Sequence, residues 1–172
     1  MKVTVIISMV ALLIYSTEIN AKKCSYEINK ADEFTGKIIK MTSATIAKSW
    51  KIGFSINDAI YAVSLVIVLP GEINTGINKG DSLYIKLKNN EIIKLAASNN
   101  VSPKTYVAGS GAYAAVVSDF SPVYECTKEE IMKISQSPVT VIRIFVGQQF
   151  LETPVDEKNG KKISDAAGCI LK

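Results

Sequence analysis

Hydrophobic and polar residues alternate along much of residues 22–172, the pattern of strands that bury one face. The run 59–69 differs, because it is apolar at nearly every position and rich in β-branched residues. A strand of that kind is expected at the centre of a sheet. The strands predicted in this way cover residues 25–29, 37–45, 50–55, 59–69, 82–88, 91–95, 113–117, 123–126 and 139–146.

Turn-forming residues separate these segments. Residues 30–36 contain an Asp and a Gly, and they predict a turn after the first strand. Asn89 and Asn90 predict a two-residue hairpin turn, because Asn tolerates positive φ. The Gly- and Asn-rich segment 72–81 and the polar segment 96–104 are expected to be loops.

Two segments predict helices. Thr127 and Glu130 form a capping-box pattern, which predicts a helix over 128–135 that ends before Pro138. A second helix is expected near 161–171, starting at Asn159-Gly160, with one apolar face made of Ile163, Ala166, Ala167 and Ile170. The predicted fold class is α+β, mainly antiparallel β-sheet with a short internal helix and a C-terminal helix. A β-sandwich with helical additions is the alternative arrangement.

The first 21 residues have the pattern of a cleavable signal peptide. Lys2 precedes an uncharged, mostly apolar run over 3–15, and Ala21 is a small residue at the expected cleavage point. The run is shorter than the roughly 20 residues that a membrane-spanning helix needs. We therefore expect a secreted or periplasmic protein with one globular domain over 22–172 and no membrane span after cleavage. An uncleaved N-terminal anchor and a lipid-modified Cys24 are the alternatives.

Charge and composition exclude several functional classes. The chain has a net charge of +4, with 19 Lys and a single Arg interleaved with acidic residues, which argues against a nucleic-acid-binding surface. It contains no His, so the sequence holds no Ser-His-Asp or Cys-His catalytic group and no His metal ligand. We expect no catalytic residue, metal or cofactor from these patterns.

Three cysteines leave one thiol unpaired if a disulfide forms. Cys24 and Cys169 lie near the two ends of the processed chain, and chain ends are often close together at a domain surface. Cys24–Cys169 is therefore the favoured pair. The alternatives are that no disulfide forms, or that Cys126 pairs with one of the other two cysteines.

Other polar motifs have ordinary structural interpretations. Residues 109–111, Gly-Ser-Gly, lack the Lys-Ser/Thr of a phosphate-binding loop and predict a turn. The acidic pairs at 32–33 and 129–130 do not have the spacing of glycosidase carboxylates. The loop 72–81 lacks the alternating carboxylates of a calcium loop. Arg143, within the strand 139–146, is the one candidate ligand contact, although pairing with a surface acid is its usual role.

The order of these motifs resembles small exported bacterial proteins of unknown function. The resemblance rests on residues 26–37, on the Glu-Glu-Ile start of the first helix and on Val-Thr-Val-Ile-Arg-Ile at 139–144. It implies no particular activity. The sequence favours an exported, non-enzymatic binding domain that contacts a protein or envelope component, its oligomeric state left open. A carboxylate-dependent hydrolase and an anchored envelope protein are the alternatives.

Overall fold

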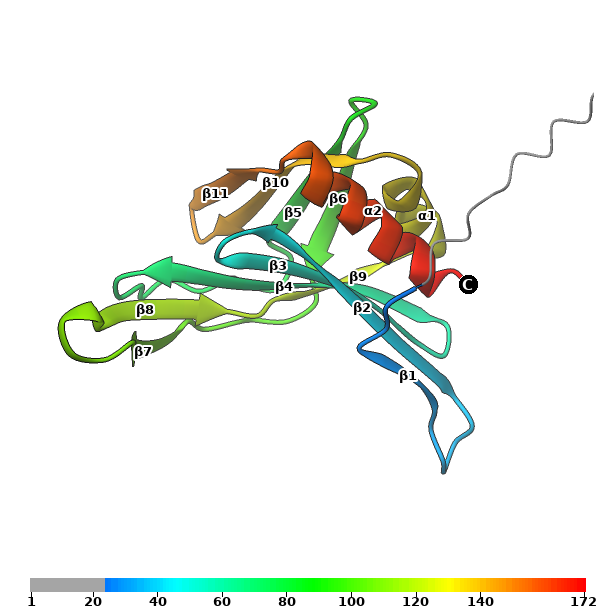
Figure 1. Ribbon diagram of the computed structural model, residues 1–172, viewed down its shortest axis with the longest axis horizontal. Coiled ribbons are helices and arrows are strands. Elements are labelled where there is room, and N and C mark those ends of the chain that lie inside the picture. Colours follow the sequence, from blue (N-terminus) through cyan, green and yellow to red (C-terminus); the bar gives the residue numbers. More distant parts are fainter. Residues whose placement is uncertain (1–23) are drawn as a thin grey trace, which may run out of the picture.

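A single antiparallel sheet of eleven strands dominates the computed structural model, which describes residues 24–172 (Figure 1). The main path of the sheet runs β1-β2-β3-β4-β9-β6-β5-β10-β11, and β8 and β7 continue from another part of β4. With one short and one C-terminal helix, this is the predicted α+β class. The predicted signal peptide, residues 1–21, lies outside the described residues.

The strands are β1 (Ile28–Ala31), β2 (Ile38–Ala47), β3 (Trp50–Asn57), β4 (Ile60–Pro70), β5 (Ser82–Leu87), β6 (Ile92–Ala97), β7 (Lys104–Ala108), β8 (Ala115–Phe120), β9 (Val123–Cys126), β10 (Val139–Val146) and β11 (Gln149–Pro154). The helices are α1 (Lys128–Gln136), α2 (Glu157–Ile170) and a short 3-10 turn at Gly111–Tyr113. Within residues 24–172, no helix is both long and apolar enough to span a bilayer.

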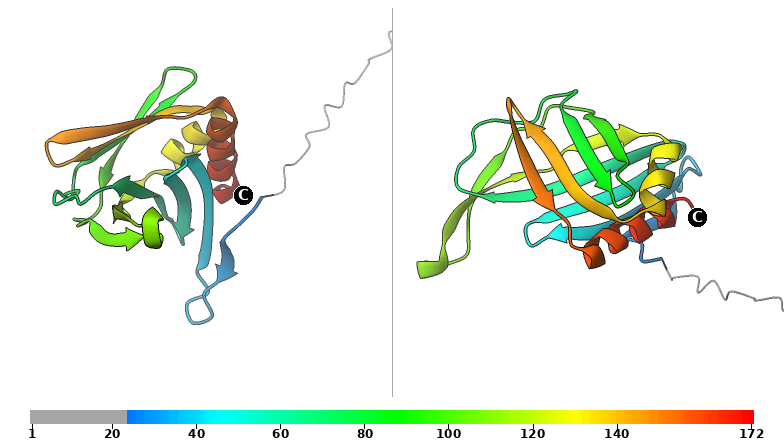
Figure 2. Two further views of the ribbon diagram at one scale, coloured as in Figure 1. Left: turned by 60° about the vertical axis from the view of Figure 1, so that its left-hand side comes forward. Right: turned by 90° about the horizontal axis from the view of Figure 1, so that it is seen from above.

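The sheet bends over on itself, so that β5, β6, β10 and β11 lie across β2, β3 and β4 (Figure 2). Strand β9 joins the two halves, because it pairs with β4 on one side and with β6 on the other. Helix α2 lies along the side of the bend, where it packs against β2, β3 and β10. The fold is therefore one bent sheet, not two separate sheets of a sandwich.

The core fills the space between the two halves and α2. The largest fully buried side chains come from the strands of the sheet, from α1 and from the loop between β4 and β5, and they are Tyr124, Phe54, Phe120, Ile46, Ile52, Leu65, Ile67, Ile77, Leu83, Ile85, Leu87 and Ile131. The predicted apolar face of the last helix joins this core, with Ile163, Ala167 and Ile170 buried and Ala166 packed at its edge. Burial of this set is the main driving force for folding.

The first helix begins as its sequence predicts. The Thr127 side chain accepts a hydrogen bond from the Glu130 N–H (3.2 Å), and the Glu130 carboxylate accepts one from the Thr127 N–H (2.8 Å). Both halves of the capping box are therefore present, and they satisfy two backbone donors that the helix start leaves free.

The second helix begins earlier than predicted. Asp156 is its N-cap and accepts from the Asn159 N–H (2.8 Å), so Asn159 and Gly160 lie inside α2. Gly160 is needed there for close packing, because a Cβ at this position would overlap the carbonyl oxygen of Val139 on β10. The sequence pattern predicted that Gly160 marks the start of the helix. In the structure, Gly160 lies within the helix and allows α2 and β10 to approach closely.

The hairpin between β5 and β6 also differs from its prediction. The Leu87 N–H donates to the Glu91 carbonyl (2.9 Å), which leaves three residues in the loop instead of two. Asn90 has φ of 67° and takes the left-handed position that a three-residue loop requires.

Two strands were not predicted, and one is less buried than expected. Strand β7 begins at the last residue of the predicted loop 96–104 and covers residues that were assigned to no element, and β11 follows the last predicted strand. Strand β4 has neighbours on both sides, yet Ile60 and Val66 are exposed. No second layer covers the outer face of β4 at these two residues.

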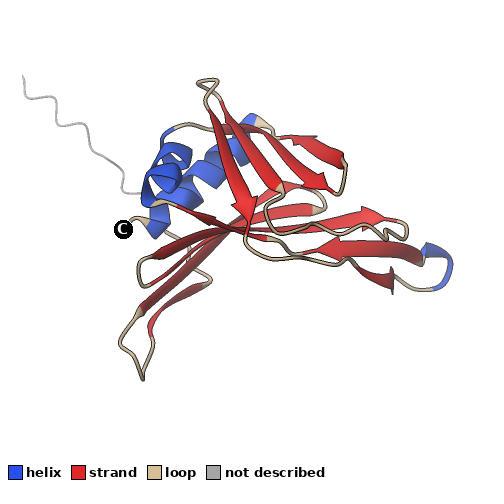
Figure 3. Ribbon diagram, turned by 180° about the vertical axis from the view of Figure 1, so that it is seen from behind, coloured by secondary structure: helices blue, strands red, loops and turns tan. Residues whose placement is uncertain are grey.

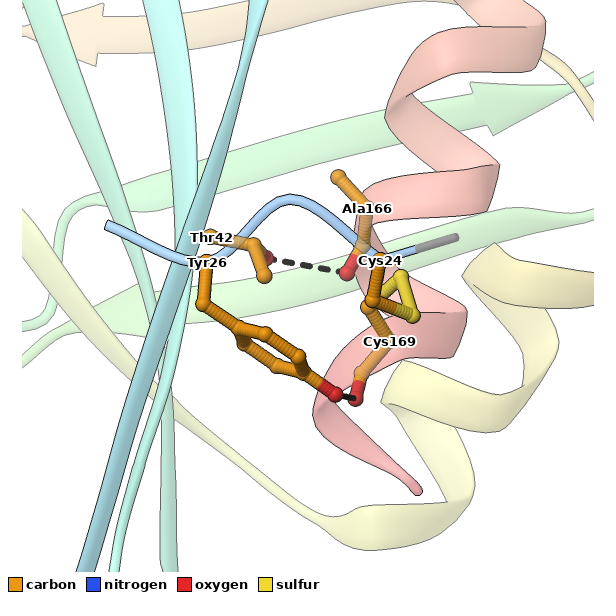
Figure 4. Close-up of a disulfide and its surroundings, with 5 residues drawn as sticks. All are labelled: Cys24, Tyr26, Thr42, Ala166 and Cys169. Carbon is orange, nitrogen blue, oxygen red and sulfur yellow. Dashed lines mark hydrogen bonds between the residues drawn. A yellow bond between two sulfur atoms is a disulfide. The ribbon is translucent and has the colours of Figure 1, made fainter. Parts of the chain in front are cut away.

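The two ends of the described chain are joined where α2 meets β2 (Figure 4). Cys24 and Cys169 form a disulfide, the pair that the sequence favoured, and Cys126 is a free cysteine. Next to the disulfide, the Tyr26 hydroxyl donates to the Cys169 carbonyl (2.9 Å) and the Thr42 hydroxyl donates to the Ala166 carbonyl (2.9 Å). These contacts attach the C-terminal part of α2 to the edge of the sheet.

Removal of the disulfide should destabilise the protein strongly. The bond joins residues 145 positions apart, and cross-links that close long loops restrict the unfolded chain most. Replacing Cys24 and Cys169 together by Ala should lower the free energy of unfolding by about 2–5 kcal/mol. Urea denaturation of the two proteins measures this difference. Equal midpoints would show that the bond adds no stability.

Two glycines of α2 provide a matched pair of substitutions. Gly160→Ala should destabilise the protein by more than about 2 kcal/mol, since the added methyl group overlaps Val139. Gly168→Ala should be neutral or stabilise it by up to about 1 kcal/mol, because a Cβ there meets only the Ser135 Cβ at 3.5 Å and Ala favours helix. Thermal denaturation of both variants distinguishes them, and similar shifts would contradict the packing described.

Candidate functional site

A shallow groove lies on the outer face of β6, β5, β10 and β11, on the side of these strands that faces away from the core. Along β5, the inward Leu83, Ile85 and Leu87 alternate with the outward Tyr84 and Lys86. The groove has a volume of about 520 Å³ and is lined by Tyr84, Lys86, Ile92, Val141, Arg143, Phe145 and Glu152. We call it the aromatic groove.

Strand register places the groove side chains in rows across the sheet. One row runs Lys94, Tyr84, Arg143, Glu152, since each residue is the direct partner of the next. Phe145 stands opposite Phe150 in the neighbouring row. Side chains opposite each other on one face of antiparallel strands are close enough to interact.

Three aromatic rings form a chain through these rows. The Tyr84 and Phe145 ring centroids are 6.0 Å apart, and those of Phe145 and Phe150 are 6.3 Å apart. Both pairs are tilted, an arrangement that aromatic rings favour. Phe150 is 55% exposed, so much of this aromatic surface is accessible to a partner.

Arg143 is held in place at the centre of the groove. Its Nε and Nη2 atoms lie 2.6 and 2.5 Å from Oε2 of Glu152, and its guanidinium carbon lies 4.6 Å from the Phe150 ring centroid. The predicted candidate therefore lies in a groove and also has the surface acid partner that is usual for such a residue. A guanidinium has five N–H donors, and the donors not directed at Glu152 remain able to bind a further acceptor.

The charged groups around the rings are mainly positive. Lys86 and Arg143 line the groove with one carboxylate, Glu152, and the Lys94 ammonium lies 5.7 Å from the Tyr84 ring centroid. Three cations and one anion make this face locally basic, so a bound group of negative charge would be favoured.

Two other grooves are present among the described residues. One, next to the disulfide, carries Lys51, Lys162 and Lys172, and most of its serine hydroxyls are already hydrogen-bonded within the protein. The other lies between the end of β4 and the β10–β11 turn. None of the three grooves brings two carboxylates together, since their acidic lining is Glu152 in the first and Asp165 in the second.

The remaining sequence candidates lie elsewhere and have local roles. Asp32 caps the β1–β2 turn, where hydrogen bonds from the side chain and backbone of Thr35 lower the pKa of its carboxyl group. In the loop 72–81, the Asp81 carboxylate accepts from the Asn78 N–H (2.7 Å). Among residues 24–172, no cluster of three or more His, Cys, Asp or Glu side chains could hold a metal ion.

Sequence reasoning found Arg143 but missed the residues that make it part of a site. Phe150 and Glu152 lie on β11, which was not predicted, and the pairing of β5 with β10 joins segments more than 50 residues apart. The sequence signal available for this hairpin was Gly147-Gln148 directly after the apolar run 139–146, and Gly147 takes φ of 60° in the turn.

Comparisons of the chain with protein-family models, curated proteins and solved structures give no match.

The free thiol of Cys126 should be unreactive in the folded protein. Burial, and secondarily the Glu130 carboxylate, raise the pKa of this thiol to about 12, and the thiolate is the reactive form. Labelling with iodoacetamide at pH 8 should be at least about tenfold slower in the native protein than in urea. Equal rates in the two states would contradict the half-buried position of Cys126 at the end of β9.

Proposed function

We propose that the protein is an exported, non-enzymatic interaction module whose aromatic groove binds an acidic, partly apolar segment of another protein. The observation that carries the proposal is the chain of rings Tyr84, Phe145 and Phe150, with Arg143 fixed beside it, on an outer face of the sheet. The core does not need this cluster, because all four side chains point away from it.

The residue types in the groove are those that dominate binding energies at protein interfaces. Tyr, Phe and Arg are enriched in interface cores, and the largest single contributions come from aromatic and Arg side chains. Arg143 is already oriented by Glu152 and Phe150 in the unbound protein. Less side-chain entropy is therefore lost when a partner binds it.

Charge indicates the chemistry of the partner. Lys86, Lys94 and Arg143 outnumber the single Glu152, so carboxylate groups on the partner would be attracted. The exposed Ile92 and Phe150 would contact apolar side chains between those carboxylates. Such a segment combines acidic residues with one or two apolar residues.

Two features support the exported location in this proposal. The sequence begins with a signal-peptide pattern, and the paired Cys24 and Cys169 fit an oxidising compartment. The hydrolase alternative gains no support, because none of the three grooves contains a carboxylate pair. The anchored alternative concerns residues outside those described.

Selection from a phage-displayed random peptide library tests the proposed groove directly. The processed protein, residues 22–172, is the target, and the Arg143→Ala/Phe150→Ala variant is the comparison. The enriched peptides should carry Asp or Glu next to apolar residues, bind the variant at least about tenfold more weakly and dissociate more readily at high salt.

Two further variants act as controls. Lys86→Glu/Lys94→Glu reverses charge without removing an aromatic ring and should reduce binding of the same peptides. Lys51→Ala/Lys162→Ala alters the groove next to the disulfide and should leave binding unchanged. Peptides that bind all variants equally, or no enrichment of acidic peptides, would contradict the proposal. Circular dichroism verifies that each variant is folded.

A further inference from the structure

The β7–β8 hairpin projects from the molecule at the end opposite to the two helices (Figure 3). Its two strands are joined by the 3-10 turn Gly111–Tyr113, and the Tyr113 side chain at this tip is 90% exposed. Residues 105–118 contain no charged side chain. A long uncharged hairpin that projects into solvent is the kind of surface that natural proteins use for association.

Strand β7 is an open edge of the sheet. In the described part of the chain three strands have one pairing partner, namely β1, β7 and β11. The other two carry residues that discourage further pairing, Lys30 in β1 and Glu152 with Pro154 in β11. Strand β7 has no Pro, and its only charged residue, Lys104, lies at its first position.

The pairing pattern shows which backbone groups of β7 point outward. The Gly71 N–H donates to the Val116 carbonyl (2.8 Å), so the backbone of Val116 faces β4. Backbone direction alternates along a strand, which directs Ala115 and Val117 toward β7 and their partners Ala108 and Tyr106 toward β8. The backbone groups of Thr105 and Val107 therefore face away from β8, at the open edge.

We propose that this edge pairs antiparallel with the β7 strand of a second copy of the chain, with Tyr106 at the twofold axis. In this register, Thr105 of each copy stands opposite Val107 of the other, and their outward N–H and C=O groups can make four hydrogen bonds between the copies. The sheets of the two copies thereby become one continuous sheet across the dimer.

The side chains favour a second copy as the occupant. In this register Lys104 stands opposite Ala108 of the other copy, so no like charges are juxtaposed across the edge. The two Tyr106 rings come together at a pair without backbone hydrogen bonds, where side chains approach most closely. A self-complementary strand of this kind satisfies the requirement of a twofold interface, where both subunits use the same surface.

The predicted dimer is weak and depends on concentration. A strand of five residues buries much less than the roughly 1,200–2,000 Å² of a stable interface. The surface lies on the half of the sheet that does not carry the aromatic groove, so this inference is independent of the function proposed above.

Disulfide trapping tests the register. In a Cys126→Ser background, Tyr106→Cys should form a covalent dimer under mild oxidation, because the two Cα atoms at the axis would be about 4.5 Å apart, within disulfide reach. Thr105→Cys is the matched control. It faces Val107 of the other copy, which leaves the two new cysteines about 8–9 Å apart and beyond reach. Intact mass measurement verifies that Cys24–Cys169 is retained.

Sedimentation of the untrapped protein provides the second measurement. The processed wild-type protein should shift from monomer to dimer as its concentration rises. Val107→Pro should remain monomeric and folded. The substitution removes an N–H that points outward, and it leaves the hydrogen bonds between β7 and β8 intact. The same substitution on β1, Asn29→Pro, should leave dimerisation unchanged. A wild-type monomer at all concentrations, or equal trapping at positions 105 and 106, would overturn the proposal.

Discussion

The packing of α2 against both halves of the bent sheet is the contact on which the rest of the structure depends. The helix touches β2 and β3 on one half and β10 on the other, and it buries Ile163, Ala167 and Ile170 between them. Gly160 allows contact with Val139, and the buried Ser164 hydroxyl donates to the Ser137 carbonyl (2.7 Å). The disulfide then fixes the end of the helix to the start of the described chain. Without α2, the side of the bend between β2 and β10 would be open to water.

This arrangement also explains how one protein can present two separate surfaces. Strand β10 is held from the inside by α2 and the core, so its outer residues Arg143 and Phe145 project from a supported backbone. The β7–β8 hairpin is attached at one end by its pairing with β4 and by the buried Ser118 and Phe120, and its other end reaches into solvent (Figure 1). A supported face suits side-chain recognition, and an unsupported edge suits strand pairing. The two proposals follow this physical difference between the halves.

Local patterns in the sequence predicted the elements that depend on local physics. Alternation located β3, β5 and β10, and the capping box located α1, because both signals arise within a few residues. Signals that depend on tertiary contacts were misread. Gly160 was read as a helix start, but it lies inside α2, where the lack of a Cβ permits close contact with Val139. The N-cap at Asp156 is a local signal, and it was missed because Asn159-Gly160 was taken as the start of the helix. Strand β7 was missed because its exposed residues lack the alternation of a half-buried strand. Arg143 was identified, but its partners on β11 and β5 come together only through pairing of distant segments.

Hydrogen exchange of the processed, oxidised protein, followed by mass spectrometry, tests most directly whether α2 holds the two halves of the sheet together. The account predicts that peptides from β2, β10 and α2 exchange slowly and lose protection together when the disulfide is reduced, while the β7–β8 hairpin exchanges fast in both states. Rapid exchange of α2 alongside fully protected β2 and β10 would contradict it, since the sheet would then keep its bend without the helix.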